Sequence, residues 1–160
     1  MFAGSGRITV ARCVIRNNVA AEWGGGIYAA GANLTLTDCV LDNNDVTVAA
    51  PGRGGGALLI SGGSTIVRDC TFDNGDAREG GAVYIYNGSP TFSGCVFRNN
   101  SATWGGAVFC NNGSGLTSSP TFQVCAFARN KATKGGAIYN PASSTGFTNV
   151  YFLQNESSQQ

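Results

Sequence analysis

The sequence contains no histidine among its 160 residues. This absence excludes serine and cysteine hydrolases that rely on a histidine base, and every zinc site with a histidine ligand. Charged residues are also scarce, since they make up 12% of the chain and leave a net charge of +1. The chain therefore lacks the basic surface that nucleic acids or anionic membranes attract, and we expect no nucleic acid as a partner.

Long apolar runs are missing as well. No stretch approaches the roughly 20 apolar residues that a membrane-spanning helix needs, so we expect no membrane span in this chain. The first residues also lack the apolar segment of a secretion signal. What the chain does contain is 24 glycines and 42% hydrophobic residues, enough to build a core in one domain over residues 1–160.

Cysteines mark a repeat that runs through the chain. Around each one, an apolar residue lies three places before, another lies two places after, and an asparagine lies five places after. The cysteines are Cys13, Cys39, Cys70, Cys95 and Cys125, and Val150 takes this place in a sixth segment. The asparagines are Asn18, Asn44, Asn100, Asn130 and Asn155, with Gly75 as the exception.

A second block follows each of the first five segments. It consists of two glycines, a small residue and two apolar residues, at 24–28, 55–59, 80–84, 105–109 and 135–139. The shortest repeats are 25 residues long, as from Cys70 to Cys95, and longer ones carry inserts at 45–54 and 111–119.

Alternation of apolar and polar residues within each repeat is typical of β-strands, and glycine, asparagine and proline mark the joins. A repeat of about 25 residues with three short strands and three bends forms one turn of a parallel β-solenoid, whose turns stack about 4.8 Å apart. We therefore predict an all-β fold, a parallel β-helix of five to six coils of about 25–30 residues each.

Equivalent positions of successive coils stack in a solenoid, so the cysteines and the asparagines are each expected to form an inward column. Stacked cysteines in one rotamer point in parallel, whereas metal ligands converge on one point. We expect free thiols, with disulfides between coils as the alternative, and neither metal nor cofactor. The asparagines are interpreted as a structural ladder of amides, each bonded to its copy one coil away.

Two motifs carry a resemblance to a known family. Phe-x-x-Asn occurs at 97–100, 127–130 and 152–155, and Gly-Gly-Ala-aliphatic at 55–58, 80–83, 105–108 and 135–138. These repeats resemble those of the chlamydial polymorphic outer-membrane proteins. The resemblance covers nearly the whole chain and implies a right-handed parallel β-helix. It also implies a secreted, surface-exposed passenger with an adhesive function.

The second face of the Gly-Gly strands carries an aromatic stripe. Its candidate binding residues are Tyr28, Tyr84, Phe109 and Tyr139, with Leu59 at the same position of the second block. If exposed, this stripe is a platform for sugar rings or for another protein. Alternatively the rings fill the core or are covered by a neighbour, because alternation alone does not determine which face lies inside.

Two pairs of aspartates are expected to stack between neighbouring coils. Asp38 and Asp69 precede their cysteines, and Asp42 and Asp73 follow them. Carboxylates about 5 Å apart match the spacing of a retaining glycosidase, and parallel β-helices include pectin-type lyases and hydrolases. Arginines share these columns, however, so surface ion pairing is the preferred interpretation, and we expect no catalytic residues.

Candidate glycosylation sites follow from five Asn-x-Ser/Thr sequences. They begin at Asn33, Asn87, Asn99, Asn112 and Asn155. Glycans on these sites require a eukaryotic source and a surface position.

Neither end of the chain carries a sequence that would cap a solenoid. We therefore expect at least one end to be covered, either by further coils, by other subunits or by end-to-end stacking of copies, which makes filaments when it does not close. The sequence as a whole predicts a non-catalytic extracellular or cell-surface β-solenoid with a structural or adhesin-like role, with surface glycans as candidate ligands. The alternatives are a carbohydrate-active or carbohydrate-binding β-helix and a packing subunit of a larger complex.

Overall fold

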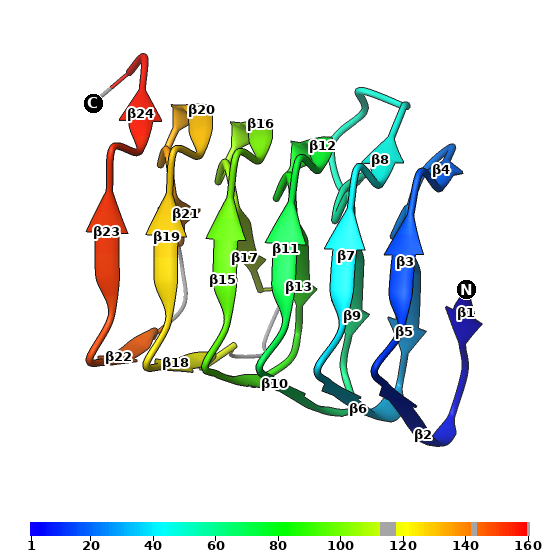
Figure 1. The fold of residues 1–160 in the computed structure, drawn as a ribbon. Helices are drawn as coiled ribbons and strands as arrows, with labels where there is room; N and C mark the ends of the chain where they lie inside the picture. The colour runs from blue at the N-terminus through cyan, green and yellow to red at the C-terminus, as the bar shows by residue number, and fades with distance from the viewer. Residues whose placement is uncertain (113–117, 142–143, 160) are drawn as a thin grey trace.

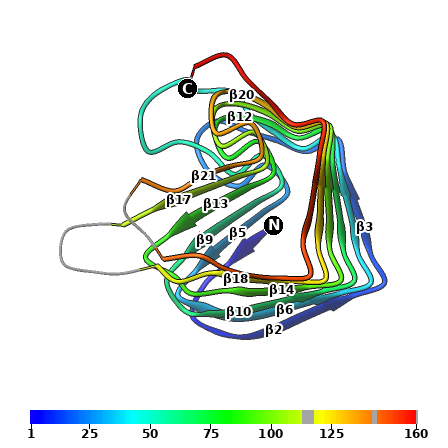
Figure 2. The same ribbon diagram turned by 90° about the vertical axis from the view of Figure 1, so that its left-hand side faces the viewer.

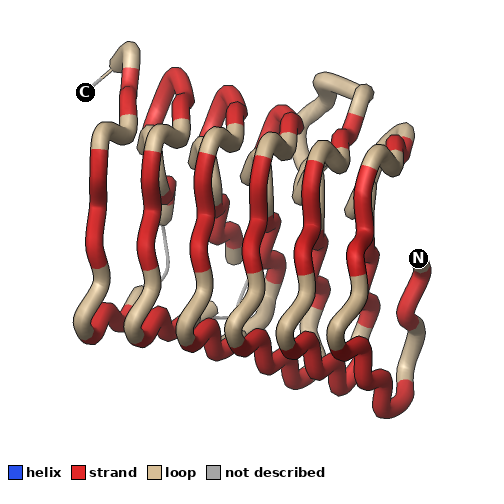
Figure 3. Tube along the Cα trace, viewed as in Figure 1, coloured by secondary structure: helices blue, strands red, loops and turns tan. Residues whose placement is uncertain are grey.

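The computed structural model describes residues 1–112, 118–141 and 144–159, and these form strands and turns without any helix (Figure 3). The chain winds through six coils, and each coil contributes one strand to each of four parallel sheets (Figure 1). Viewed along the axis, equivalent strands of successive coils lie behind one another (Figure 2). This is the predicted parallel β-solenoid.

The four sheets are named A to D in the order in which each coil visits them. Sheet A contains β1 (Phe2–Ala3), β5 (Ile27–Ala30), β9 (Leu58–Ser61), β13 (Val83–Tyr86), β17 (Val108–Asn111) and β21 (Ile138–Tyr139). Sheet B contains β2 (Gly6–Ala11), β6 (Ala32–Thr37), β10 (Ser64–Arg68), β14 (Thr91–Ser93), β18 (Thr121–Gln123) and β22 (Gly146–Thr148). Sheet C contains β3 (Val14–Arg16), β7 (Val40–Asp42), β11 (Thr71–Asp73), β15 (Val96–Arg98), β19 (Ala126–Ala128) and β23 (Tyr151–Leu153). Sheet D contains β4 (Val19–Ala20), β8 (Asp45–Val46), β12 (Asp76–Glu79), β16 (Ser101–Trp104), β20 (Lys131–Lys134) and β24 (Glu156–Ser157).

The prediction of three strands per coil was wrong, because each coil has four. The additional strand belongs to sheet D and follows the ladder asparagine. Its members are two to four residues long and mostly polar, as in Lys131–Lys134. Such short segments do not show the apolar alternation by which a strand is recognised in sequence.

Two corners of every coil depend on a residue in the left-handed backbone conformation. The residue before each cysteine position turns the chain from sheet B to sheet C, as Asp38 does with φ 54°. The residue before each ladder asparagine turns it from sheet C to sheet D, as Asn43 does with φ 51°. Asparagine and aspartate tolerate this conformation better than other non-glycine residues, which explains their recurrence at the corners.

The glycine pair forms the turn from sheet D to sheet A, and each glycine has its own reason. Gly80 has φ 63°, and its counterparts in the other coils are also left-handed. Gly81 passes so close to the backbone of the next coil that an added Cβ would overlap the carbonyl oxygens of Gly106 and Ser101. Any side chain there would force the coils apart.

Aromatic columns fill the interior. Phe72, Phe97, Phe127 and Phe152 stack with near-parallel rings at centroid distances of 4.8, 4.6 and 5.2 Å. A second column, which includes Phe92 and meets the first edge-on, occupies the equivalent positions of sheet B. Ring packing of this kind ties each coil to its neighbours on both sides.

The asparagines form the ladder that their spacing suggests. Asn130 Nδ2 donates to Asn155 Oδ1 over 2.8 Å, and Asn100 Nδ2 donates to Asn130 Oδ1 over 2.9 Å. Asn18 and Asn44 make the same contact over 2.8 Å in the first two coils. At the third coil the ladder is interrupted, and the backbone N–H of Gly75 donates to Asn100 Oδ1 instead. The amides thus satisfy buried backbone groups at one corner of every coil.

Candidate functional site

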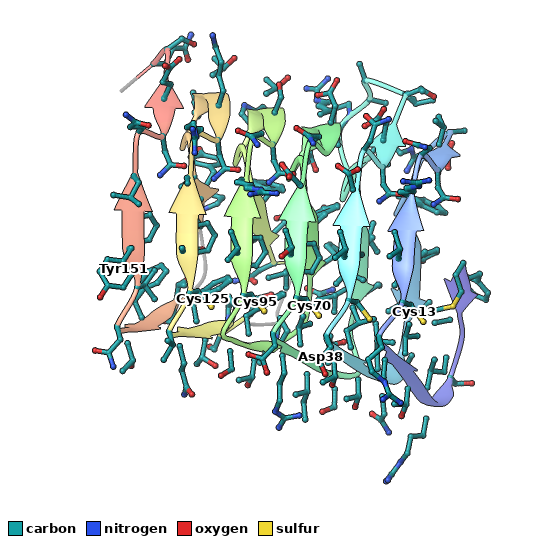
Figure 4. All side chains as sticks on the ribbon, in the orientation of Figure 1. Cys13, Asp38, Cys70, Cys95, Cys125 and Tyr151 are labelled. Atoms are coloured by element: carbon teal, nitrogen blue, oxygen red, sulfur yellow. The ribbon has the colours of Figure 1, made fainter. Side chains whose placement is uncertain are left out.

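The thiols of the cysteine column form hydrogen bonds with the backbone. Cys39, Cys70, Cys95 and Cys125 are buried, and each thiol donates to the carbonyl oxygen two residues earlier, 3.0–3.4 Å away. The Cys13 thiol makes the same contact, with the Ala11 carbonyl oxygen over 3.2 Å, but it is exposed in the first described coil. All six cysteines are free thiols, and the sulfur atoms of the labelled residues lie in a row (Figure 4).

The acidity of Cys70, Cys95 and Cys110 is that of buried core residues, whereas the hydrogen bond with Cys95 lowers the pKa of the Cys125 thiol. Burial raises the pKa of Cys70 and of Cys110 to about 12. The neighbouring Cys125 thiol, together with burial, also raises the pKa of Cys95. Protonated thiols are poor nucleophiles and poor metal ligands. Among the described residues, no group of three or more histidine, cysteine, aspartate or glutamate side chains could hold a metal ion.

The aspartate columns are largely engaged in contacts between coils. Asp73 accepts from Arg98 Nε over 2.7 Å and from Asn99 Nδ2 over 2.8 Å, so both of its oxygens are occupied. Asp42 Oδ1 accepts from Asn74 Nδ2 over 2.9 Å. Asp38 and Asp69 are exposed at the corner between sheets B and C, and Figure 4 labels Asp38 there. A carboxylate held by a cation and an amide is poorly suited to attack a sugar or to protonate a leaving group.

The candidate glycosylation sites differ in their exposure to solvent. Asn33 and Asn99 are exposed, and Asn87 and Asn112 are half-buried. The sequence after Asn112 continues into residues 113–117, outside the described part of the chain. Asn155 belongs to the ladder, where its Nδ2 donates to the Phe127 carbonyl oxygen over 2.8 Å. A glycan on that nitrogen would have to displace this ladder contact.

The aromatic stripe lies on the outer face of sheet A, but most of it is covered by other side chains. Tyr84 and Phe109 are only 3% and 4% exposed, and with Leu59 they form an apolar cluster separate from the main core. Tyr28 and Tyr139 pack against this cluster and are half-buried. The prediction of an open aromatic platform was therefore wrong at Tyr84 and Phe109, and the alternative of cover by a neighbour describes them.

The side chains that cover the stripe come from the residue directly before each glycine pair, at the end of the sheet D strand. Trp23, Gly54, Glu79, Trp104 and Lys134 occupy this position in successive coils and pair in register. The Trp23 ring lies 5.6 Å from Tyr28, and the Trp104 ring lies 6.0 Å from Phe109. The tryptophans thus face the stripe across the turn from sheet D to sheet A.

This tryptophan column is interrupted in the middle, and a groove opens there. Gly54 has no side chain, and an added Cβ would overlap the carbonyl oxygen of Glu79. The groove has a volume of about 330 Å³, at the small end of the range for ligand pockets. It is lined by Trp23, Tyr28, Gly52, Arg53, Leu59, Ser61, Tyr84, Tyr86 and Asn111. Figure 2 shows the segment between β8 and β9, which supplies Gly52 and Arg53, projecting from this turn.

Contacts within the groove hold its walls in place. The Arg53 guanidinium lies 4.8 Å from the centre of the Trp23 ring and 3.4 Å from Glu22 Oε1. Trp23 Nε1 donates to the Gly52 carbonyl oxygen over 3.1 Å. The most accessible rings are those of Trp23 and Tyr86, which are 38% and 36% exposed. The site therefore combines two partly exposed aromatic rings, one of them stacked with the Arg53 guanidinium, with several hydrogen-bonding groups.

A buried carboxylate supports the groove from beneath. Glu79 is 2% exposed, and its Oε1 accepts from the Gly52 backbone N–H over 3.0 Å. The Tyr84 hydroxyl lies nearby, yet Glu79 Oε2 meets no donor in hydrogen-bond geometry among the described residues. Burial raises the pKa of Glu79, although Gly52, Arg78 and Tyr84 partly offset this effect. Burial also raises the pKa of Tyr84 to about 12.

Replacing Glu79 with glutamine is expected to stabilise the protein at neutral pH. A carboxyl whose pKa is raised by folding stabilises the folded state below its ordinary pKa, and that contribution is lost as pH rises through the folded-state value. Glutamine is always neutral and keeps a carbonyl oxygen for the Gly52 N–H. The melting temperature of Glu79→Gln should exceed that of the wild type at pH 7, and the difference should shrink below pH of about 4.5.

Glu156→Gln provides the matched control, because Glu156 is exposed and forms only a surface ion pair with Lys131 over 3.6 Å. Such pairs contribute about 0–1 kcal/mol, so this variant should show no gain at pH 7. A Glu79→Gln variant that melts below the wild type at pH 7 would show that the carboxylate is needed in its charged form.

Several residues that line the groove or pack beside the aromatic stripe were missed in the sequence. Trp23, Glu79 and Trp104 could have been recognised by their shared position directly before each glycine pair. Arg53 and Gly52 belong to an insert, which has no counterpart in the other coils and so no signal in the repeat.

The described residues form no helix, and so no helix that could cross a membrane.

Comparison with known proteins places the architecture in a family. No curated protein and no solved structure matches the chain. The family model described as the right-handed β-helix region matches residues 1–156, nearly the whole sequence. Together with the six stacked coils, this match shows that the chain belongs to the right-handed β-helix family.

Proposed function

We propose that this protein is a non-catalytic, adhesin-like element of an extracellular or cell surface, and that it binds carbohydrate in the groove on the outer side of sheet A. The observation that carries the proposal is the groove itself, with the exposed rings of Trp23 and Tyr86 beside Arg53, Ser61 and Asn111. Sugars present apolar faces and hydroxyl groups, and such a site offers aromatic surface and hydrogen bonds to both.

Further observations support a binding role. The Tyr84 hydroxyl and the Asn111 amide are already joined by a hydrogen bond of 3.2 Å, so this part of the groove is formed before any ligand arrives. The Asp42 and Asp73 carboxylates, by contrast, are committed to contacts between coils. The resemblance of the repeats to polymorphic outer-membrane proteins also favours a role at a surface.

Truncation of the exposed rings tests the site. Trp23→Ala and Tyr86→Ala should each weaken binding to glycans about tenfold, because an aromatic anchor at the centre of a contact commonly contributes more than 1.4 kcal/mol. Binding is first screened on a glycan array and then measured by titration calorimetry with the best-bound oligosaccharide. Tyr151→Ala is the matched control, since Tyr151 is exposed on β23, away from the groove (Figure 4).

Two results would count against the proposal. Absence of glycan binding, or equal losses in Tyr151→Ala and in the groove variants, would remove the groove as the site. Cleavage of a polysaccharide that disappears in Asp38→Asn or Asp69→Asn would replace the non-catalytic function with an enzymatic one.

A further inference from the structure

The positive charge that borders the groove is already paired. Among the described residues that line the groove, Arg53 alone carries a charge. Its guanidinium lies 3.4 Å from Glu22 Oε1 and 4.8 Å from the centre of the Trp23 ring. An anionic ligand would have to compete with Glu22 for this guanidinium and would gain little from it. The groove is therefore poorly arranged for a negatively charged ligand.

Arg78, the other cation near the groove, is also engaged elsewhere. Its Nη1 donates to the Ala49 carbonyl oxygen, and its guanidinium lies 5.0 Å from the centre of the Trp104 ring. Neither Ala49 nor Trp104 lines the groove. Arg78 does lower the pKa of the neighbouring Glu79, but burial raises that pKa and has the larger effect. Arg78 therefore compensates the Glu79 carboxylate only in part.

Glu79 is left as a buried carboxylate without a partner ion. It is 2% exposed, and no described lysine or arginine forms an ion pair with it. Its Oε1 accepts from the Gly52 N–H, whereas Oε2 has no hydrogen-bond donor among the described residues. Gly52 and Tyr84, which both line the groove, lie directly beside this carboxylate. Its negative charge therefore acts on an occupant of the groove with little water to screen it.

Tyrosine rings that line the groove favour a cation as well. Tyr84 and Tyr86 meet at a centroid distance of 6.3 Å and an interplanar angle of 60°, and Tyr28 lines the same groove. The face of an aromatic ring attracts a positive charge, and the attraction grows when the charge is removed from water. Ser61 and Asn111 add oxygen atoms that can accept hydrogen bonds from an ammonium group. The rings, these acceptors and the carboxylate behind them all favour an ammonium ion.

On the basis of the proposed carbohydrate site, we propose that the groove selects amino sugars, in which a free amine carries a positive charge, over neutral and acidic sugars. The ammonium group lies over the faces of Tyr84 and Tyr86, within electrostatic reach of Glu79. A hydroxyl group in this place leaves the carboxylate uncompensated, and an acidic group meets a charge of like sign. Glu79 is thus a specificity-determining residue that acts through the charge of the ligand.

Titration calorimetry with a matched pair of saccharides tests this selection. The trisaccharide of chitin and its fully deacetylated form differ only in the acetyl groups, which remove the positive charges. At a pH of about 6, where free amines are protonated, we expect the deacetylated form to bind about tenfold more tightly. High salt should reduce this ratio, because part of the preference is electrostatic.

Glu79→Gln identifies the source of the preference. Glutamine keeps an acceptor for the Gly52 N–H but carries no charge, so the ratio of the two affinities should fall to about one. Tyr86→Leu, at a partly exposed ring, should also lower the ratio. Glu156→Gln is the matched control, because it removes an exposed carboxylate of β24 outside the groove and should keep the ratio of the wild type. Circular dichroism would verify that all three variants are folded.

Three results would overturn the selection of amino sugars. Equal binding of the two trisaccharides by the wild type would remove the preference for charge and leave the carbohydrate site in place. Tighter binding of an acidic trisaccharide, lost in Arg53→Gln, would assign the groove to the opposite charge. Tighter binding of a lysine-rich peptide than of the amino sugar would assign the ammonium site to a protein ligand. Binding of neither trisaccharide would overturn the selection too, and the glycan array then decides separately on the carbohydrate site.

Discussion

Phe97→Ala is expected to lower the free energy of unfolding by about 3–5 kcal/mol, the largest effect of any single truncation in this chain. The Phe97 ring is fully buried and lies between Phe72 and Phe127, with interplanar angles of 7° and 4°. It also meets Phe92 and Phe122 edge-on. Truncation leaves a cavity that the coils above and below cannot fill without breaking their strand pairing. Urea unfolding followed by circular dichroism measures the loss.

Phe152→Ala is the matched control, because Phe152 occupies the same column in the last coil. Its ring is half-exposed and stacks on Phe127 alone within this column. A solenoid is stabilised mainly by contacts between neighbouring coils, so the terminal truncation should cost less than about 2 kcal/mol. Similar losses in the two variants would contradict the view that stacking on both sides gives Phe97 its importance.

Much of this fold could be predicted from the sequence, because a solenoid converts spacing along the chain into columns in space. Asn100 and Asn130 recur at the same distance from their cysteines, and in the structure they are hydrogen-bonded neighbours. Phe97 and Phe127 follow the same rule and stack at 4.6 Å. Equivalent residues of successive repeats can be predicted to be neighbours even when the bend angles of the coil are unknown.

Contacts between different positions of the repeat could not be predicted in this way. Trp104 covers Phe109 only because the glycine pair between them turns sheet D back over the outer face of sheet A. That geometry depends on a left-handed glycine and on close backbone approach, and neither is visible in the alternation of apolar residues. The sequence alone therefore could not distinguish an exposed aromatic stripe from a covered one.

The groove was hidden for a further reason. It exists where the repeat fails, at Gly54 in the tryptophan column, and where an insert adds Arg53. A residue that departs from the repeat has no equivalent in the other coils with which it could be compared. Its contacts can therefore be found only in the three-dimensional structure. For the same reason the best candidate for function lies among the residues that the repeat does not constrain.

Asn130→Ala is expected to lower the free energy of unfolding by about 2–4 kcal/mol, because it leaves several buried polar groups without partners. The Asn130 side chain, which is fully buried, donates to the Phe97 carbonyl oxygen over 3.0 Å and to Asn155 Oδ1. Its own Oδ1 accepts from the backbone N–H and from Nδ2 of Asn100, over 3.1 and 2.9 Å. Alanine removes all of these bonds and admits no water to replace them.

Asn18→Ala tests whether this cost arises from burial in the ladder. The Asn18 side chain donates to Asn44 Oδ1 and to the Arg16 carbonyl oxygen, but it is exposed at the open first coil. Water can satisfy the groups that it leaves, so urea unfolding of Asn18→Ala should show a loss below about 1 kcal/mol. If both variants lost the same stability, the interior amide would be no more important than an exposed one. The ladder would then be a consequence of the stacked coils rather than one of the forces that hold them in register.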